Sequence, residues 1–492
     1  MKQKILLQKN SIILKNMFNS KYLIGLSLLG TLYLSSCKIP ALTTVDPTVK
    51  VPEKYNKNSD TNSVAAVKWR DYFTDPYLQN LIDTALVNNR ELMITLKEIE
   101  IAQNEVRLKK GKILPVGGVR GGLGVDKPGR YTSAGAGDAT TEIEPGKAMP
   151  DPMTDFNIGA FVTWEVDIWK KLRNAKEAAA KRYLGSVEGK NFLITSLVAE
   201  IADNYYELMA LDNQLEIVTQ NIKLQKDALE IVKVQKEATR TTELAVQKFQ
   251  AEVYKTESMK YEIRQNITET ENRINMLLSR FPQPILRSSP TYLNDVPRVI
   301  ATGIPAQLMQ NRPDIKQAEL EMEAAKLDVK AARAEFYPTL EISSFIGLQA
   351  FKPGYLAKIP ESMAYSLVGD LVGPIINRSA IKAEFNMANA RQLQALYEYE
   401  KTVISAYLEV ANQMAGIENL NDNYKLKVKQ VDALNQSISI SNDLFRYAKA
   451  DYLEVLMTQR DALEAKMELI ETQKARMSAV VYIYKGLGGG WQ

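Results

Sequence analysis

The side chains that most often do chemistry in proteins are nearly absent from this sequence. Its 492 residues include no histidine and a single cysteine, Cys37. Histidine is the most frequent general base and metal ligand, and one cysteine can form neither a disulfide within the chain nor a CxxC metal site. Carboxylates and lysines remain, but no compact acidic cluster and no glycine-rich phosphate loop stands out. We therefore expect no enzyme, no metal site and no cofactor.

The cysteine follows a segment typical of exported proteins. Residues 1–36 carry five lysines and no acidic residue, and the apolar run at 22–34 is too short for a helical membrane span, which needs about 20 apolar residues. Leu34–Cys37 (Leu-Ser-Ser-Cys) resembles the box at which bacterial lipoproteins are cleaved and lipidated on the cysteine. We predict a lipoprotein signal peptide at 1–36 and lipidation of Cys37, the alternative being a plain signal peptide and an incidental cysteine. Lys38, in place of an aspartate, fits export to the outer membrane by the same resemblance.

The net charge argues against nucleic acid as a partner. The chain has a formal charge of +4, from 62 basic and 58 acidic residues. Five of the basic residues are the lysines of residues 1–36, so the remainder has 57 basic residues against 58 acidic ones. A nearly neutral chain gives no electrostatic basis for binding nucleic acid.

Beyond the first segment, the sequence occurs twice in related form. Leu86–Arg90 matches Leu308–Arg312 at an offset of 222, and Ala199–Asp203 matches Leu408–Asn412 at an offset of 209. Between them, after one inserted residue, identical residues at 100–115 and 323–338 match at an offset of 223. Each copy has the order helix, proline-ended break, short strands, very long helix, turn and long helix, which indicates a duplication. The predicted parts are an anchored extended segment at 37–74, a first repeat at 75–290, a second repeat at 291–485 and a glycine-rich tail at 486–492.

Apolar side chains at every seventh position predict the long helices. The first copy has Ile201, Leu208, Leu215, Ile222 and Leu229, and adding 209 gives Val410, Ile417, Tyr424, Val431 and Ile438. This spacing is typical of a coiled coil. The stretch from about 170 to 235 contains no proline, and at ~1.5 Å per residue it would form a rod on the order of 100 Å long. The helices alone would equally fit a plain helical bundle or a cytosolic coiled coil.

Four segments between the helices alternate with a period of two instead. They lie at about 117–126, 155–167, 340–350 and 364–375. Runs of about 9–11 alternating residues are what a membrane-spanning strand needs, with one face in lipid and one in water. A soluble hairpin would alternate in the same way, but here two hairpins occupy matching places in two repeats.

Membrane strands in this number predict an oligomer. Four strands cannot stand in a bilayer, because their open edges would leave unpaired backbone groups in hydrocarbon at several kcal/mol each. Roughly eight strands form the smallest barrel, which side chains fill. Two chains would reach that number, whereas three would supply twelve strands and leave room for a channel. We therefore expect a mainly helical fold with a duplicated repeat, whose four strands contribute to a trimeric 12-stranded β-barrel.

Several motifs resemble those of the outer membrane factor, or TolC-like, family, and specifically its lipoprotein branch of drug-efflux channels. They are Trp69–Asp75, Asn311–Asp314, Ala331–Pro338 and the terminal Tyr484–Trp491 (Tyr-Lys-Gly-Leu-Gly-Gly-Gly-Trp). The resemblance covers nearly the whole chain beyond residue 37. It implies a homotrimer with a strand barrel in the outer membrane of a Gram-negative bacterium and a barrel of twelve long helices in the periplasm. A periplasmic adaptor and an inner-membrane pump would be the partners.

The same resemblance implies a gate at the periplasmic helix turns, near 238–243 and 447–453. Family members close there with a tyrosine, an arginine and rings of aspartates, and the corresponding candidates are Tyr447, Asp451 and Glu454. The arginine position falls near Ala450. Three symmetry-related carboxylates on one axis would raise one another's pKa and attract cations. The alternative is that these carboxylates are ordinary solvated charges at a helix end.

Together with these patterns, the resemblance implies the outer-membrane exit channel of a tripartite efflux system, a passive trimer that exports small molecules and drugs across the periplasm and the outer membrane. Two alternatives remain. The first is an outer-membrane exit channel for type I protein secretion, which would use the same fold with another pump. The second is a periplasmic coiled-coil adaptor without a pore, although adaptors have one helical hairpin and this chain has two.

Overall fold

We describe a computed structural model of the chain. It covers residues 39–42, 46–55, 64–288, 302–374, 378–447 and 449–491, so Cys37 and the predicted signal peptide lie outside the described residues. The main helices are α3 (Trp69–Tyr72), α4 (Pro76–Asn88), α5 (Arg90–Gly111), α7 (Lys171–Glu237), α8 (Glu243–Leu277), α9 (Leu308–Asn311), α10 (Pro313–Ala334), α12 (Ser379–Arg446) and α13 (Tyr452–Gly486). Shorter helices are η1 (Val64–Ala66), α6 (Ser133–Asp138), η3 (Pro305–Gln307) and α11 (Pro353–Leu356). The strands are β1 (Val116–Asp126), β2 (Glu142–Glu144), β3 (Lys147–Ala148), β4 (Met153–Val166), β5 (Thr339–Ala350) and β6 (Met363–Val372).

The chain divides into two compact units, which we describe separately. The first contains Gly111–Ala175 and Leu327–Ala390, and the second contains Asp46–Lys110, Lys176–Lys326 and Arg391–Gln492. Each unit takes segments from both sequence repeats. Among the helices that the structure describes, none is long and apolar enough to cross a membrane.

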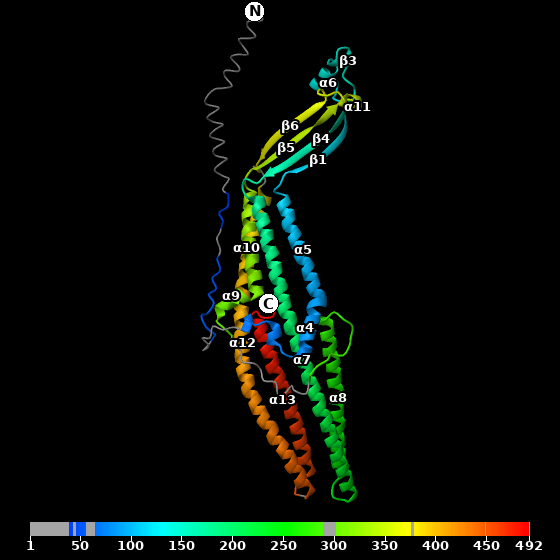
Figure 1. Ribbon diagram of the computed structural model, residues 1–492, viewed down its shortest axis with the longest axis vertical. Helices are drawn as coiled ribbons and strands as arrows, with labels where there is room; N and C mark the ends of the chain where they lie inside the picture. Colours follow the sequence, from blue (N-terminus) through cyan, green and yellow to red (C-terminus); the bar gives the residue numbers. More distant parts are fainter. Residues whose placement is uncertain are drawn as a thin grey trace, which may run out of the picture. The chain divides into compact units, whose positions relative to one another are not determined.

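The first unit is built on a four-stranded antiparallel sheet in the order β1-β4-β5-β6 (Figure 1). The pairing is in register along each ladder, and one row runs from Val119 through Ala160 and Ile346 to Tyr365. The structure confirms the four predicted strands. The fourth ends earlier than the predicted limit of 375, because Pro374 has no N–H group with which to continue the ladder.

The two faces of this sheet differ completely in charge. The strands contain six charged residues, and the register places all of them on one face: Arg120, Asp126, Asp155, Glu165, Glu341 and Asp370. We call this the polar face. The opposite face, the apolar face, has no charged residue and exposes large side chains such as Val119, Ile346 and Leu367. The alternation of the sequence therefore produces a sheet with one wet and one apolar side.

The second unit contains two long antiparallel helical hairpins, α7 with α8 and α12 with α13 (Figure 1). The helix α7 has 67 residues and α12 has 68. The bounds repeat the sequence offsets, since α8 shifted by 209 gives α13 and α5 shifted by 223 gives α10. The structure thus confirms both the long helices and the duplication.

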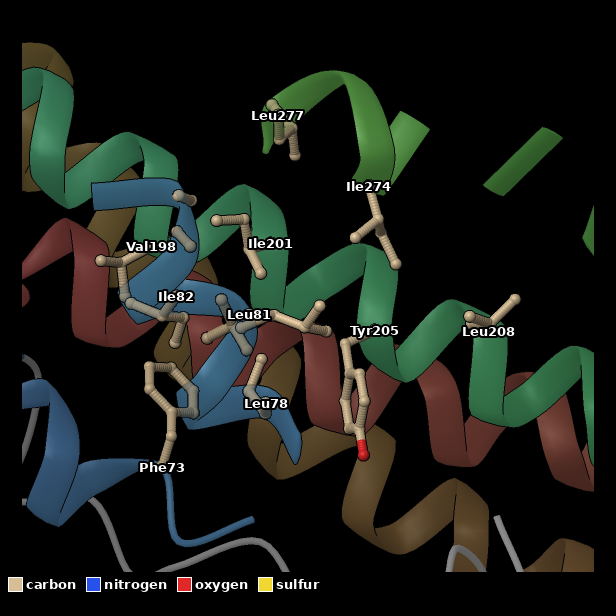
Figure 2. Packing of buried hydrophobic residues seen from close by; sticks show 14 of the residues in the cluster. Phe73, Leu78, Leu81, Ile82, Val198, Ile201, Tyr205, Leu208, Ile274 and Leu277 are labelled. Atoms are coloured by element: carbon tan, nitrogen blue, oxygen red, sulfur yellow. The ribbon is translucent and has the colours of Figure 1, made fainter. Parts of the chain in front are cut away.

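A cluster of buried apolar residues in the second unit joins the N-terminal helices to the hairpins. Figure 2 shows Ile82 of α4 beside Val198 of α7, in a cluster that also contains Leu78 and Ile201. The helix α4 starts at this place because Asp75 caps it, accepting hydrogen bonds from the N–H groups of residues 77 and 78. The second carboxylate oxygen of Asp75 accepts a hydrogen bond from Tyr205 Oη at 2.7 Å. The cap therefore also fixes α4 to α7.

The glycine-rich segment after α13 is part of this core. Gly488 has a φ of +89° and ends the helix in a Schellman turn, in which the N–H of Gly489 reaches the carbonyl of Tyr484 at 3.0 Å. A Cβ atom on Gly488 would lie 2.5 Å from the carbonyl oxygen of Asn311. Only glycine fits this position, so the predicted tail is a closely packed element.

We expect Gly488→Ala to destabilise the protein by about 1–3 kcal/mol, because alanine is strained in the left-handed conformation of this residue and its Cβ atom would clash with the backbone at Asn311. The control is Gly416→Ala in α12, where a Cβ atom meets nothing within 4 Å. That change should stabilise the helix by roughly 0.5–1 kcal/mol. Thermal unfolding of the purified variants in detergent measures both effects, and equal midpoints would contradict the packing described.

Candidate functional site

The predicted gate residues lie around the turn between α12 and α13. Tyr447 directly follows α12 and is 76% exposed, Asp451 is the N-cap residue of α13, and Glu454 lies in the first turn of that helix. The backbone N–H of Glu454 donates to the carbonyl of Asp451 at 3.1 Å. Among the described residues, the two carboxylate groups have no hydrogen-bond or ion-pair partner. Both are exposed, at a helix N-terminus whose dipole favours negative charge.

The turn between α7 and α8 joins helices with equivalent bounds but has different chemistry. Thr242 occupies the position equivalent to Asp451, and its hydroxyl caps α8 by accepting from the N–H of Ala245 at 3.4 Å. Asp451 makes no such side-chain bond, so its carboxylate remains available for other contacts. The position equivalent to Glu454 is Ala245, which is fully buried. The first turn therefore lacks carboxylates at these two positions, and Glu243 at the start of α8 is paired with Lys236.

The polar face of the sheet is a second candidate surface. It holds a cavity of about 640 Å³ lined by Arg120, Asp155, Asn157, Phe161, Thr163, Ser343, Ser344, Phe345, Gln349 and Ser366. Near one end of the strands, Glu165 pairs with Glu341 and Glu341 pairs with Asp370 in the strand register. We call these three carboxylates the acidic row. Glu165 forms an ion pair with Lys171, whereas Glu341 and Asp370 are exposed and have no partner among the described residues.

Three of the sequence motifs that carry the family resemblance meet in the second unit, at a place that we call the junction. The Tyr72 ring stacks on the Tyr484 ring with centroids 4.0 Å apart, and Tyr72 Oη donates to the carbonyl of Val480 at 2.9 Å. Tyr484 Oη donates in turn to the carbonyl of Val67 at 2.5 Å. The first motif is thereby held against the last one.

Arg312 connects the third motif to the junction. The residue is 6% exposed, and its guanidinium forms a bidentate pair with Asp314 at 3.0 and 2.7 Å. It also donates to Glu409 of α12 at 2.7 Å and to the carbonyl of Gly486 at 2.8 Å. Burial by itself lowers the pKa of Arg312, but the hydrogen bonds and charges of both carboxylates outweigh it and raise the pKa above its usual value.

The first repeat makes the equivalent connection with a neutral side chain. Asn89 directly precedes α5, as Arg312 directly precedes α10, and it donates to the carbonyl of Leu277 at 2.8 Å. Leu277 ends α8, as Gly486 ends α13. Its side-chain oxygen accepts from the N–H of Leu92 at 2.8 Å and caps α5. Each repeat therefore ties the start of its shorter helix to the end of its second long helix.

Comparison with known proteins assigns the fold to a family. Residues 81–280 and 304–489 match the family described as "Outer membrane efflux protein". This chain belongs to the outer membrane efflux protein family. The match covers most of both repeats, including Arg312 and Tyr484 of the junction, and it confirms the family that the motifs predicted.

Individual relatives match over almost their whole length. The "Cation efflux system protein CusC" of Escherichia coli O6:H1 is 25% identical over 453 residues, covering 91% of this chain and 94% of that protein. The "Probable outer membrane lipoprotein SilC" of Salmonella typhimurium is 24% identical, covering 90% of this chain and 94% of that protein. The open state of the MtrE outer membrane channel of Neisseria gonorrhoeae superposes with a TM-score of 0.78 at 22% identity, over 93% of this chain and 99% of that one. The fold is therefore that of the outer membrane channels.

Only some residues of these sites could be predicted from the sequence. It pointed to Tyr447, Asp451 and Glu454, which the structure places around one turn; their function as a gate stays a prediction. The alternation of the four strands predicted one face in lipid and one in water, and the strand register adds that all six charged residues lie on the same face. The buried ion pairs of Arg312 could not be read from spacing, because Glu409 lies 97 residues away. In the described part of the chain, no group of acidic or cysteine side chains could hold a metal ion.

We expect Arg312→Ala to lower the free energy of unfolding by about 3–5 kcal/mol, because it leaves two carboxylates in the junction without their cation. Arg460→Ala is the control, since Arg460 is paired with Asp461 on the surface and both side chains are 47% exposed. That change should cost less than 1 kcal/mol. Denaturant titration in detergent compares the two, and a small effect at Arg312 would refute its structural importance.

Proposed function

We propose that the protein is the passive exit channel of a tripartite efflux system and that three copies form it. The segregation of charge on the sheet carries this proposal. A four-stranded sheet with one uncharged apolar face and one face with all six charges matches a wall that separates lipid from water. Family membership supports transport out of the cell through the outer membrane as the biological role.

The strand directions support closure of the sheet between copies. Each strand is antiparallel to its neighbour, so β1 and β6 run in opposite directions at the two edges. The β6 edge of one copy can therefore pair antiparallel with the β1 edge of the next. Two copies would supply eight strands, which side chains fill, whereas three copies supply twelve and leave a lumen. Closure removes every unpaired backbone group from the hydrocarbon.

Charge gives the lumen of this proposed barrel a cation preference. In each chain the polar face of the strands has five carboxylates and one arginine. Three copies would surround the lumen with fifteen carboxylates and three guanidinium groups. Rings of acidic side chains favour cations in channels.

The remaining parts of the proposal concern anchoring and partners. Lipidation of Cys37 would add an acyl anchor beside the barrel, and the name of SilC as a lipoprotein supports this reading. A periplasmic adaptor would connect the hairpin turns to an inner-membrane pump, which supplies the energy. The exported molecules would be small, since the names of the relatives CusC and SrpC refer to cation efflux and solvent efflux. Export of proteins by the same channel is the alternative, whereas family membership disfavours a non-pore adaptor.

We expect the purified chain to form trimers that conduct in planar bilayers with a preference for cations. Changing both unpaired members of the acidic row, Glu341→Gln with Asp370→Asn, should move the reversal potential in a salt gradient toward zero. A trimer that never conducts would contradict the channel.

A strain that lacks the gene should become sensitive to small toxic compounds while its protein secretion stays unchanged. The reverse result would favour the secretion alternative.

We expect the candidate gate to respond to divalent cations. In a trimer, Asp451 and Glu454 of three copies would converge, and bridging Mg²⁺ would relieve their repulsion and reduce the current. Asp451→Asn with Glu454→Gln should weaken this block about tenfold in conductance titrations. Asp461→Asn, further along α13 in a surface ion pair, is the control and should leave it unchanged. Equal block in all three proteins would contradict a carboxylate gate at this turn.

A further inference from the structure

Two phenylalanines interrupt the polar face of the sheet. Phe161 of β4 and Phe345 of β5 are direct partners in the strand register, so their side chains lie side by side. Both line the cavity of about 640 Å³, together with polar residues such as Asn157 and Thr163. Large apolar side chains on a wetted wall are unfavourable unless something covers or uses them. This pair therefore needs an explanation.

Glycines beneath the rings allow them to lie along the wall. A Cβ atom on Gly118 of β1 would be 3.0 Å from the ring of Phe161. Cβ atoms on Gly159 and Gly347 would lie 2.7 and 2.8 Å from the ring of Phe345. These glycines leave the space that the rings occupy, and the rings cover backbone that glycine would expose. Both rings remain only partly buried in the single chain, so aromatic surface is still accessible.

Negative charge lies on the same face within a few residues of the rings. Phe161 precedes Glu165 by four residues on β4, and Phe345 follows Glu341 by four on β5, so each ring is two same-face positions from the acidic row. Asp155 lines the cavity on the other side of the pair, and Arg120 is the single cation of this face. Aromatic faces attract cations, and nearby carboxylates strengthen that preference.

We propose that Phe161 and Phe345, with the acidic row, form a contact site for lipophilic organic cations passing through the lumen. The proposal rests on the proposed function, in which the polar face lines the channel. The aromatic rings would hold the apolar or aromatic part of the solute, and the carboxylates would attract its charge. We call this the aromatic contact site.

The lumen is wide enough that a solute bound at this site would not close it. Twelve strands about 4.8 Å apart and tilted by about 40° give a barrel roughly 24 Å across between backbones. Six rings lying along such a wall leave the centre open. A weak, repeated contact suits transport, because binding must be favourable enough to enter and weak enough to leave.

The test compares two cations of similar size in planar bilayers containing the full-length protein. Tetraphenylphosphonium presents aromatic rings, whereas tetrabutylammonium does not. Cations held at the wall would narrow the lumen without closing it, so we expect a partial reduction of the current. Tetraphenylphosphonium should reach half of this reduction at about tenfold lower concentration than tetrabutylammonium in the unchanged protein. Phe161→Ser with Phe345→Ser should bring the ratio of the two blocking concentrations close to one.

Two further variants separate recognition from folding. Phe161→Leu with Phe345→Leu keeps an apolar cover over the glycines but removes the aromatic rings, so the ratio should fall while thermal stability is retained. If the serine variant fails to assemble, the leucine variant still tests whether the aromatic rings cause the difference between the two cations. Tyr365→Leu removes an exposed aromatic ring from the apolar face and should leave the ratio unchanged.

The outcomes distinguish the contact site from the channel itself. A ratio that stays high in the leucine variant, or that is near one in the unchanged protein, overturns the aromatic contact site while the channel stands. A ratio that falls equally with Tyr365→Leu also overturns it, because the effect would then not come from the polar face. If the unchanged protein carries no current before either blocking cation is added, the proposed function is contradicted instead.

Discussion

The open edges of the four-stranded sheet are the constraint on which the rest of this molecule depends. In the described structure β1 pairs only with β4 and β6 only with β5, so each chain leaves two rows of backbone groups unpaired. Water satisfies such groups, but hydrocarbon does not. A sheet whose one face is free of charge therefore needs strands from other copies before it can enter a bilayer. The even number of strands and their alternating directions make that pairing geometrically simple.

Because of the duplication, the second unit has two hairpins with matching helix bounds. Their side chains at equivalent positions nevertheless differ. The bounds of α8 and α13 are related by a single offset of 209. At the turns, however, Thr242 uses its hydroxyl to cap a helix, whereas Asp451 leaves its carboxylate unused. The same divergence appears at the junction, where Asn89 and the charged Arg312 hold equivalent carbonyl groups. In both places the first repeat uses a neutral side chain and the second uses a charged one.

Much of this fold could be predicted from the sequence, because its signals are local and periodic. Period-two runs gave the strands, heptads gave the long helices, and the offsets gave the duplication. The end of β6 was placed too late, since the pattern carried past Pro374. Contacts between distant residues could not be predicted from one sequence. The stacking of Tyr72 on Tyr484 and the ion pair of Arg312 with Glu409 depend on how separate helices pack, and periodicity contains no information on that.

The second unit cannot finish folding early, because contacts at the junction join residues that are far apart in the sequence. Tyr484 Oη reaches the carbonyl of Val67, 417 residues earlier, and Gly488 fits against Asn311. The centre of the second unit thus stays incomplete until these late residues arrive. Contacts so distant along the chain form slowly, because a long loop must close before any of them contributes. For a polypeptide that crosses a membrane before it folds, this delay is useful: early segments cannot lock into a compact core while the remainder is still threading through a translocation pore.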